Sequence, residues 1–140
     1  MLKAVREGDA LLPLAKEIDQ ERINRWAELS GDFNRLHVDP DYARQTPFKG
    51  TIAHGPLSLA FLNELMMASF GEVWAESGRL LDVRFLAPVR PGDMIRIGGT
   101  VTGFSEEGGK NFVTCDLFVE KDGTKAVVGR GMVPWKGGKP

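Results

Sequence analysis

The amino-acid sequence predicts a single α+β domain in which an antiparallel sheet wraps around one buried helix. Its 140 residues suit one domain, here residues 1–140. The stretch from Pro56 to Phe70 is apolar on nearly every side, which is typical of a helix buried on most faces. From Arg79 onward, apolar and polar residues alternate with a period of two, as in strands with one buried face.

The first third of the chain predicts an extended segment followed by a helix. Residues 1–18 have the character of an extended chain with a turn at residues 7–9. Asp19 is a suitable N-cap for a helix that continues to about Leu29, and Gly31 should end it. The inner face of this helix is expected to hold Ile23, Trp26, Ala27 and Leu29 to Ser30.

Residues 31–55 are the unusual part, because they are polar, rich in turn formers and contain both histidines. Asp39 and Pro40 resemble an N-cap and first helical residue, and they predict a short helix over residues 41–45. The rest of this stretch has no helical or strand pattern, so we expect a loop. Gly55 and Pro56 then open the buried helix.

The second half of the chain predicts antiparallel strands. Alternating runs cover residues 81–85, 95–101, 113–119 and about 125–133, and turn formers separate them at residues 89–93, 106–109 and 121–123. One face of the sheet should meet the buried helix, and the other should meet solvent or a partner. Residues 135–140 are expected to form a flexible tail.

Composition excludes several classes of function. The net charge is −1, from 18 basic and 19 acidic side chains without a basic stripe, so no nucleic-acid partner is expected. Cys115 is the only cysteine, which excludes an internal disulfide and a zinc-type spacing. The first residues lack a signal peptide's apolar run, and the most apolar stretch is too short to span a bilayer. We expect a cytoplasmic protein without membrane contact.

The candidate catalytic residues are Asp32 and His37, followed by His54 and Gly55 at the start of the buried helix. In a loop, a carboxylate and an imidazole five residues apart can converge, hold a water molecule and take a proton from it. A free N–H at Gly55, at the positive end of the helix dipole, could bind a carbonyl that becomes an enolate. Together these groups suggest addition of water across a polarised double bond.

Structural roles explain several of the same residue types. A lone Asp–His spacing often belongs to surface or capping residues, and Asp39 is read as a cap. Ser58 and Asn63 are read as polar helix residues near the site or an interface. Met66, Met67 and Cys115 are read as core or interface residues.

The motif resembles the MaoC-like family, which includes the (R)-specific enoyl-CoA hydratases. The resemblance rests on Ser30-Gly31-Asp32-x-Asn34-x-Leu36-His37, on Ala43, on His54-Gly55 and on the stretch from Phe85 to Asp93. It implies a hot-dog fold, in which a long central helix is wrapped by an antiparallel sheet. It also implies a homodimer or a dimer of dimers, with the acyl thioester near the subunit interface.

The resemblance further implies roles for individual residues. Asp32 and His37 would activate water for syn addition to a trans-2-enoyl thioester, and the Gly55 N–H would hold the thioester oxygen. Asn34 is expected to shape the loop, His54 to be structural, and Asn63 to bind substrate or shape the site. No cofactor or metal is expected, because coenzyme A would enter as part of the substrate.

Two residues depart from the family pattern. Arg35 replaces the usual proline, and Pro56 replaces a common methionine. We hypothesise that Arg35 meets a coenzyme A phosphate or a carboxylate on the substrate. The full set of candidate cations for a phosphate groove is Arg35, Arg44, Lys49, Arg84 and Arg90.

Two other functions stay open on the sequence. A hot-dog thioesterase would need an acidic residue on or near the central helix, and Glu64 is the candidate. A non-catalytic subunit of a heteromeric hydratase is the second alternative, although a silent subunit has no need of Asp32 and His37.

Overall fold

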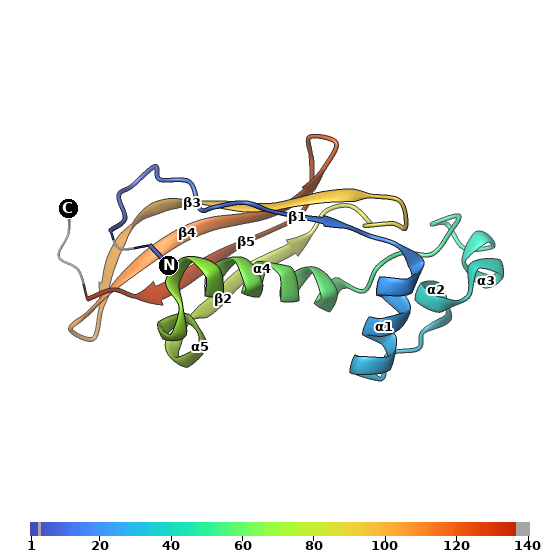
Figure 1. Cartoon of the computed structure of the whole chain (residues 1–140), viewed down its shortest axis with the longest axis horizontal. Helices are drawn as coiled ribbons and strands as arrows, with labels where there is room; N and C mark the ends of the chain where they lie inside the picture. The colour runs from blue at the N-terminus through green and yellow to red at the C-terminus, as the bar shows by residue number, and fades with distance from the viewer. Residues whose placement is uncertain (3, 137–140) are drawn as a thin grey trace.

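The computed structural model describes residues 1–2 and 4–136, which form one antiparallel sheet around a central helix (Figure 1). The sheet has five strands in the order β1-β3-β4-β5-β2. This is the α+β hot-dog architecture expected from the sequence. In chain order the elements are β1 (Leu14–Glu17), α1 (Gln20–Ser30), α2 (Arg35–Val38), α3 (Pro40–Arg44), α4 (Gly55–Phe70), α5 (Glu72–Ser77), β2 (Arg79–Phe85), β3 (Met94–Glu107), β4 (Lys110–Lys121) and β5 (Thr124–Pro134).

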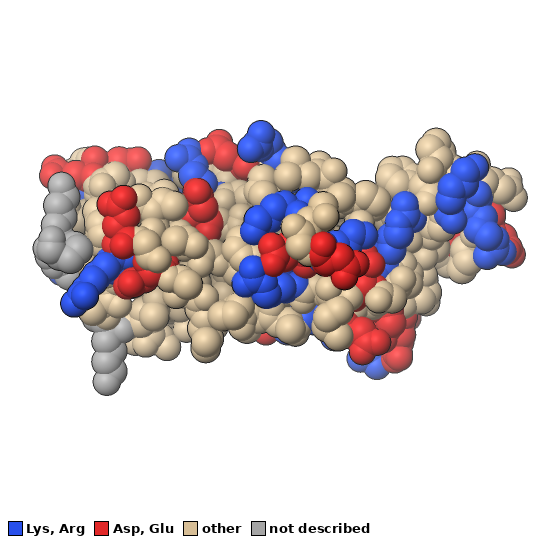
Figure 2. Space-filling view, turned by 90° about the horizontal axis from the view of Figure 1, so that it is seen from above, with Lys and Arg blue, Asp and Glu red and all other residues tan. Residues whose placement is uncertain are grey.

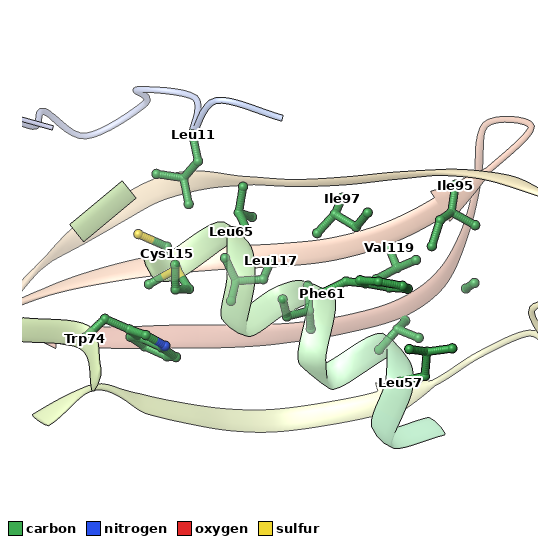
Figure 3. Packing of buried hydrophobic residues seen from close by; sticks show 14 of the residues in the cluster. Leu11, Leu57, Phe61, Leu65, Trp74, Ile95, Ile97, Cys115, Leu117 and Val119 are labelled. Carbon is green, nitrogen blue, oxygen red and sulfur yellow. The ribbon is translucent and has the colours of Figure 1, made fainter. Parts of the chain in front are cut away.

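Helix α4 is the centre of the core, as its apolar sequence predicts. Its residues Leu62, Leu65 and Met66 have no exposed surface. Side chains of the sheet, among them Ile97 and Leu117, pack around it (Figure 3). A β-carbon on Gly131 of β5 would lie 2.7 Å from Cε of Met66, so the Met66 side chain packs directly against the backbone of this strand.

The N-terminal helix begins and ends where the sequence predicts. The Asp19 carboxylate accepts the N–H of Arg22, and Gly31 ends α1 with a left-handed φ of 76°. Its inner face is narrower than expected. Ile23 and Ala27 are fully buried, whereas Leu29 is 79% exposed, so the assignment of Leu29 to the inner face was wrong.

The strands match the predicted alternation and extend beyond it. Strands β3 and β4 pair along their length, from Arg96 opposite Glu120 to Glu107 opposite Lys110. The register shifts between Val101 and Gly103. The predicted hairpin turns contain residues with positive φ, including Gly108 and Gly109. A second register shift, in the pairing of β2 with β5, coincides with the left-handed conformation of Asp82.

Two short helices and one packed residue differ from the prediction. Helix α2 lies where a loop was expected, and α5 follows α4 after the sharp turn at Gly71. Trp135 was expected to begin the flexible tail. Its backbone N–H donates to the backbone carbonyl of Asn111 at 2.9 Å, and its ring packs edge-on against that of Phe70. Lys136 is exposed, and residues 137–140 of that expected tail lie outside the described residues.

The arrangement places α1, α2 and α3 together at the end of the sheet where α4 begins (Figure 1). On the face seen in Figure 2, acidic and basic side chains are interspersed rather than gathered by sign. None of the helices within the described ranges is long and apolar enough to cross a bilayer.

Candidate active site

The loop between α1 and α2 fixes the position of Asp32. Its Oδ1 accepts the N–H of Asn34 at 3.1 Å, and Oδ1 of Asn34 accepts the N–H of Leu36 at 3.0 Å. Two successive side-chain-to-backbone turns therefore hold the loop, and Asn34 caps α2. Asp32 is exposed, and within the described part of the chain its Oδ2 accepts no hydrogen bond. That oxygen is available to a water molecule or a substrate.

His37 is held in one tautomer by the backbone. Its Nδ1 lies 2.8 Å from the carbonyl oxygen of Ile52. A carbonyl can only accept, so Nδ1 carries the proton, and Nε2 of the neutral ring is left with a free lone pair. The residue's own carbonyl accepts the side-chain amide of Gln20 at 2.8 Å, and the other end of that amide accepts the hydroxyl of Thr51. These bonds join α1, α2 and the segment before α4.

His54 joins the two halves of the site. Its Nε2 donates to the backbone carbonyl of Asp32 at 2.9 Å, and its ring stacks on that of His37 with centroids 3.9 Å apart. The side chain is 1% exposed, and its Nδ1 has no hydrogen-bond partner among the described residues. Side-chain O or N atoms of Asp32, His37 and His54 lie within 4.8 Å of one another. The pair expected from the motif therefore converges, with His54 beside it.

Gly55 begins α4 directly beside these side chains. In the described ranges its N–H donates to no protein group, and Pro56 has no N–H to offer. A β-carbon on Gly55 would lie 2.9 Å from Cε1 of Phe85, so the ring of Phe85 packs directly against this glycine. The free N–H at the positive end of a helix is suited to bind an oxygen that gains negative charge.

A cavity of about 400 Å³ opens beside the two imidazoles. Its polar lining comes from His37, His54 and Ser58, and Ser58 is buried. The other lining residues are mostly apolar, namely Phe48, Ile52, Ala53, Gly55, Phe85, Leu86, Ala87, Pro88, Val89 and Val127. An apolar cavity with a few convergent polar groups is the usual form of a small-molecule site.

Comparison with known proteins identifies the family. The family model described as "MaoC like domain" matches residues 4–121. The chain belongs to the MaoC-like domain family. It is 36% identical over 138 residues to an (R)-specific enoyl-CoA hydratase of Rhodospirillum rubrum, covering 95% of this chain and 91% of that one.

Two further relatives agree with this assignment. A 3-hydroxyacyl-thioester dehydratase of Mycobacterium tuberculosis is 37% identical over 76% of this MaoC-like chain and 74% of its own. Among solved structures, an (R)-hydratase from A. caviae involved in PHA biosynthesis superposes with a TM-score of 0.78 at 27% identity. The match covers 94% of this chain and 98% of that one.

Arg35, Asn63 and Glu64 lie outside the convergent group of this MaoC-like site. Arg35 forms an ion pair with Asp39 at 2.9 Å and does not line the cavity. Asn63 accepts the indole N–H of Trp74 at 2.6 Å, which ties α4 to α5. Glu64 pairs with Lys16 at 2.8 Å on the surface, away from the cavity lining, so the residue considered for a thioesterase is not at this site.

The convergent group also contains residues that can ligate a metal. Asp32, His37 and His54 are all of metal-ligand type. Each ring uses one nitrogen for a backbone carbonyl. One nitrogen of each ring therefore remains for a proton or a ligand.

Sequence reasoning missed Gln20, Thr51 and the carbonyl of Ile52, which orient the candidate base. Their bonds connect residues 17, 31 and 15 positions apart. No local pattern marks such contacts, because glutamine, threonine and a backbone carbonyl are common on any surface.

Proposed function

We propose that this MaoC-like protein adds water reversibly across the 2,3 double bond of a trans-2-enoyl-CoA to give an (R)-3-hydroxyacyl-CoA. The single observation that carries the proposal is the hydrogen bond from Nδ1 of His37 to the carbonyl of Ile52. It leaves Nε2 as a proton acceptor, next to a carboxylate and an unengaged N–H at the start of a helix. These are the groups that hydration requires.

The reaction uses one water molecule held between Asp32 and His37. As the water oxygen bonds to C3 of the substrate, Nε2 of His37 takes a proton from it. The Asp32 carboxylate orients the same water and stabilises the imidazolium that forms. The imidazolium then returns the proton at C2. The hydroxyl and the proton arrive from the same face, so the addition is syn.

The Gly55 N–H supports the intermediate. When the water attacks C3, the electron pair of the double bond moves toward the thioester, whose oxygen gains negative charge. A fixed N–H at the N-terminus of α4 stabilises this oxyanion more than the neutral carbonyl, which is the condition for faster reaction. The apolar cavity beside it accommodates the acyl part of the substrate.

No cofactor or metal takes part in the proposed reaction. Coenzyme A enters and leaves as the thiol part of the substrate. Asp32 and His37 carry out the proton transfer themselves, so the proposed addition needs no metal-bound water.

We also place the enzyme in the cytoplasm as a homodimer. The free, buried thiol of Cys115 suits a reducing compartment. Phe85, Leu86 and Phe48 are 56%, 55% and 39% exposed around the mouth of the cavity. Large apolar side chains grouped at one opening favour burial by a second copy of the chain. Sedimentation analysis of the purified protein tests this assembly.

The hydratase is tested by loss of the conjugated thioester absorbance of crotonyl-CoA. The wild type should hydrate it, and chiral analysis of the product should give the (R) isomer. Asp32→Asn and His37→Gln should each lower kcat by about 100-fold or more, because each removes a group that handles the proton. Asp41→Asn, whose side chain is 85% exposed, is the matched control and should behave as wild type.

Unfolding curves for all three variants separate lost chemistry from lost folding. A folded wild type that leaves crotonyl-CoA and longer enoyl-CoAs unchanged would refute the proposal. Release of free thiol from acyl-CoA in place of hydration would instead identify a thioesterase.

A further inference from the structure

We propose that Lys49 and Arg90 form an anion-binding site at the cavity mouth for the phosphate groups of the thioester carrier. The inference rests on the proposed hydratase, because it concerns the part of that substrate remote from the double bond. It assigns two residues that have no role in the chemistry itself.

The two cations belong to segments that meet at the cavity. Phe48 and Val89 both line it, and each is the neighbour in sequence of one cation. The N–H of Ala53 donates to the carbonyl of Val89 at 2.7 Å, which joins the segments. A methyl group built on Gly50 would lie 3.8 Å from Nη1 of Arg90, so this guanidinium lies beside the residue that follows Lys49.

The structure separates these two from the other candidate cations. Arg35 is paired with Asp39 and Arg44 with Asp41, so their charges are already compensated. Arg84 lines a different hollow, together with residues of β4 and β5.

Lys49 and Arg90 differ from Arg35 and Arg44 in having no ion pair. No carboxylate lies within 4.0 Å of the amino group of Lys49 or the guanidinium of Arg90 in the described ranges. Arg90 is half-buried as well. Two positive charges on adjoining segments without a counter-ion are best compensated by a bound anion.

The chemistry of the substrate supplies such an anion. An acyl chain lies in an apolar cavity, while its carrier extends toward the mouth. Coenzyme A and the prosthetic group of an acyl carrier protein both carry a phosphate at the end of a pantetheine arm. A guanidinium binds phosphate through two parallel N–H donors, and an ammonium adds a point charge. Phosphate is therefore the anion that fits both the charges and their position.

The test compares thioesters that differ only in their phosphates. We would measure kcat and KM of wild type and of the Lys49→Ala/Arg90→Ala double variant with crotonyl-CoA, crotonyl-phosphopantetheine and crotonyl-pantetheine. The matched control is Arg6→Ala/Lys110→Ala, which removes the same charge at exposed positions that do not line the cavity. We expect the first double variant to raise KM for crotonyl-CoA roughly tenfold with little change in kcat, and the control to leave it unchanged.

The phosphate-free thioester decides the outcome. Crotonyl-pantetheine should show the same KM with wild type and with the Lys49→Ala/Arg90→Ala variant. A rise in KM for crotonyl-phosphopantetheine would assign the pair to the phosphate shared by both carriers, and a rise with crotonyl-CoA alone would assign it to the additional phosphates of coenzyme A. An unchanged KM for crotonyl-CoA, or an equal rise for crotonyl-pantetheine, would overturn the inference.

Binding of free coenzyme A separates this inference from the proposed function. Calorimetric titration of wild type and of both double variants needs no turnover. If the wild type binds coenzyme A, and the Lys49→Ala/Arg90→Ala variant binds it more weakly, the anion site stands even where crotonyl-CoA is not hydrated. Equal binding by all three proteins would refute the site whatever the catalytic activity.

Discussion

At the scale of single residues, hydrogen bonds give the imidazole rings of His37 and His54 different roles. His37 donates from Nδ1 to a carbonyl and keeps Nε2 for the substrate. His54 donates from Nε2 to the carbonyl of Asp32, and its buried Nδ1 is left without a partner in the described residues. His54 is therefore a positioning residue, which fixes the Asp32 loop and supports the ring of His37.

Two substitutions separate these contributions of His54. His54→Gln can keep a donor for the Asp32 carbonyl but removes the stacked ring, and His54→Phe keeps a ring but removes the donor. We expect each to lower kcat by about tenfold with a smaller change in KM, because each loosens one half of the acid–base pair. Rates as a function of pH should show whether the ionisation of His37 moves. Wild-type kcat in both variants, with only stability reduced, would limit His54 to filling the core.

The motif predicted the convergent residues but not their environment. Local spacing suggested Asp32, His37 and Gly55, and the resemblance of the surrounding motif to the MaoC-like family singled them out. Asn63 was misplaced because its indole partner Trp74 lies on α5, a helix that the sequence did not predict. The ion pair of Arg35 with Asp39 spans one turn of a helix that was expected to be loop.

At the scale of secondary structure, Asp39 links the short helices α2 and α3. It follows the last residue of α2, and its carboxylate accepts the N–H of Tyr42 as the N-cap of α3. It also pairs with the Arg35 guanidinium. The N–H of Tyr42, followed by the Arg35 side chain, lowers the pKa of Asp39 below its ordinary value of 3.8.

This lowered pKa predicts a pH-dependent contribution to stability. Because the folded state favours the ionised carboxylate, the contribution is present above about pH 3.8 and is lost as the pH falls through the folded-state value. Asp39→Asn keeps a capping oxygen but removes the charge. We expect it to lower Tm at pH 7, and the difference from wild type should shrink below pH 3.8. A difference of constant size down to pH 2 would contradict this origin.

Elements with strong local patterns were predicted, and short elements held by tertiary contacts were not. The apolar run of α4 and the alternating strands leave little choice of structure. The four residues of α2 have no such pattern, and the helix depends on the Asn34 cap and on packing against α1 and α3. Helix α5 depends similarly on burial of Trp74.

At the scale of the whole molecule, Cys115 shows how completely the core excludes solvent. It lies on β4 with no exposed surface. Burial, with a smaller effect of Asp116, raises the pKa of its thiol to about 12. The thiol should therefore react negligibly with a disulfide reagent at pH 8 in the native protein, and stoichiometrically in denaturant.

The raised pKa of Cys115 also predicts a loss of stability in alkali. Above about pH 8.5 the unfolded chain ionises this thiol while the folded protein keeps it protonated, so the free energy of unfolding falls by up to about 1.4 kcal/mol per pH unit. Urea unfolding of wild type and Cys115→Ala at pH 8 and pH 10 isolates the effect. The wild type should lose more stability than the variant, and parallel losses would show that the thiol is not responsible.

The sheet order also has a consequence for how the protein is made. Strand β1 pairs with β3, so Leu14 meets Ile97, and β2 pairs with β5, so Arg79 meets Met132. While residues 1–85 leave the ribosome, neither outer strand has a neighbour, and the apolar α4 has no sheet to cover it. Long-range pairing of this kind folds slowly and exposes apolar surface meanwhile. The nascent chain should therefore be a client of chaperones until β5 has emerged.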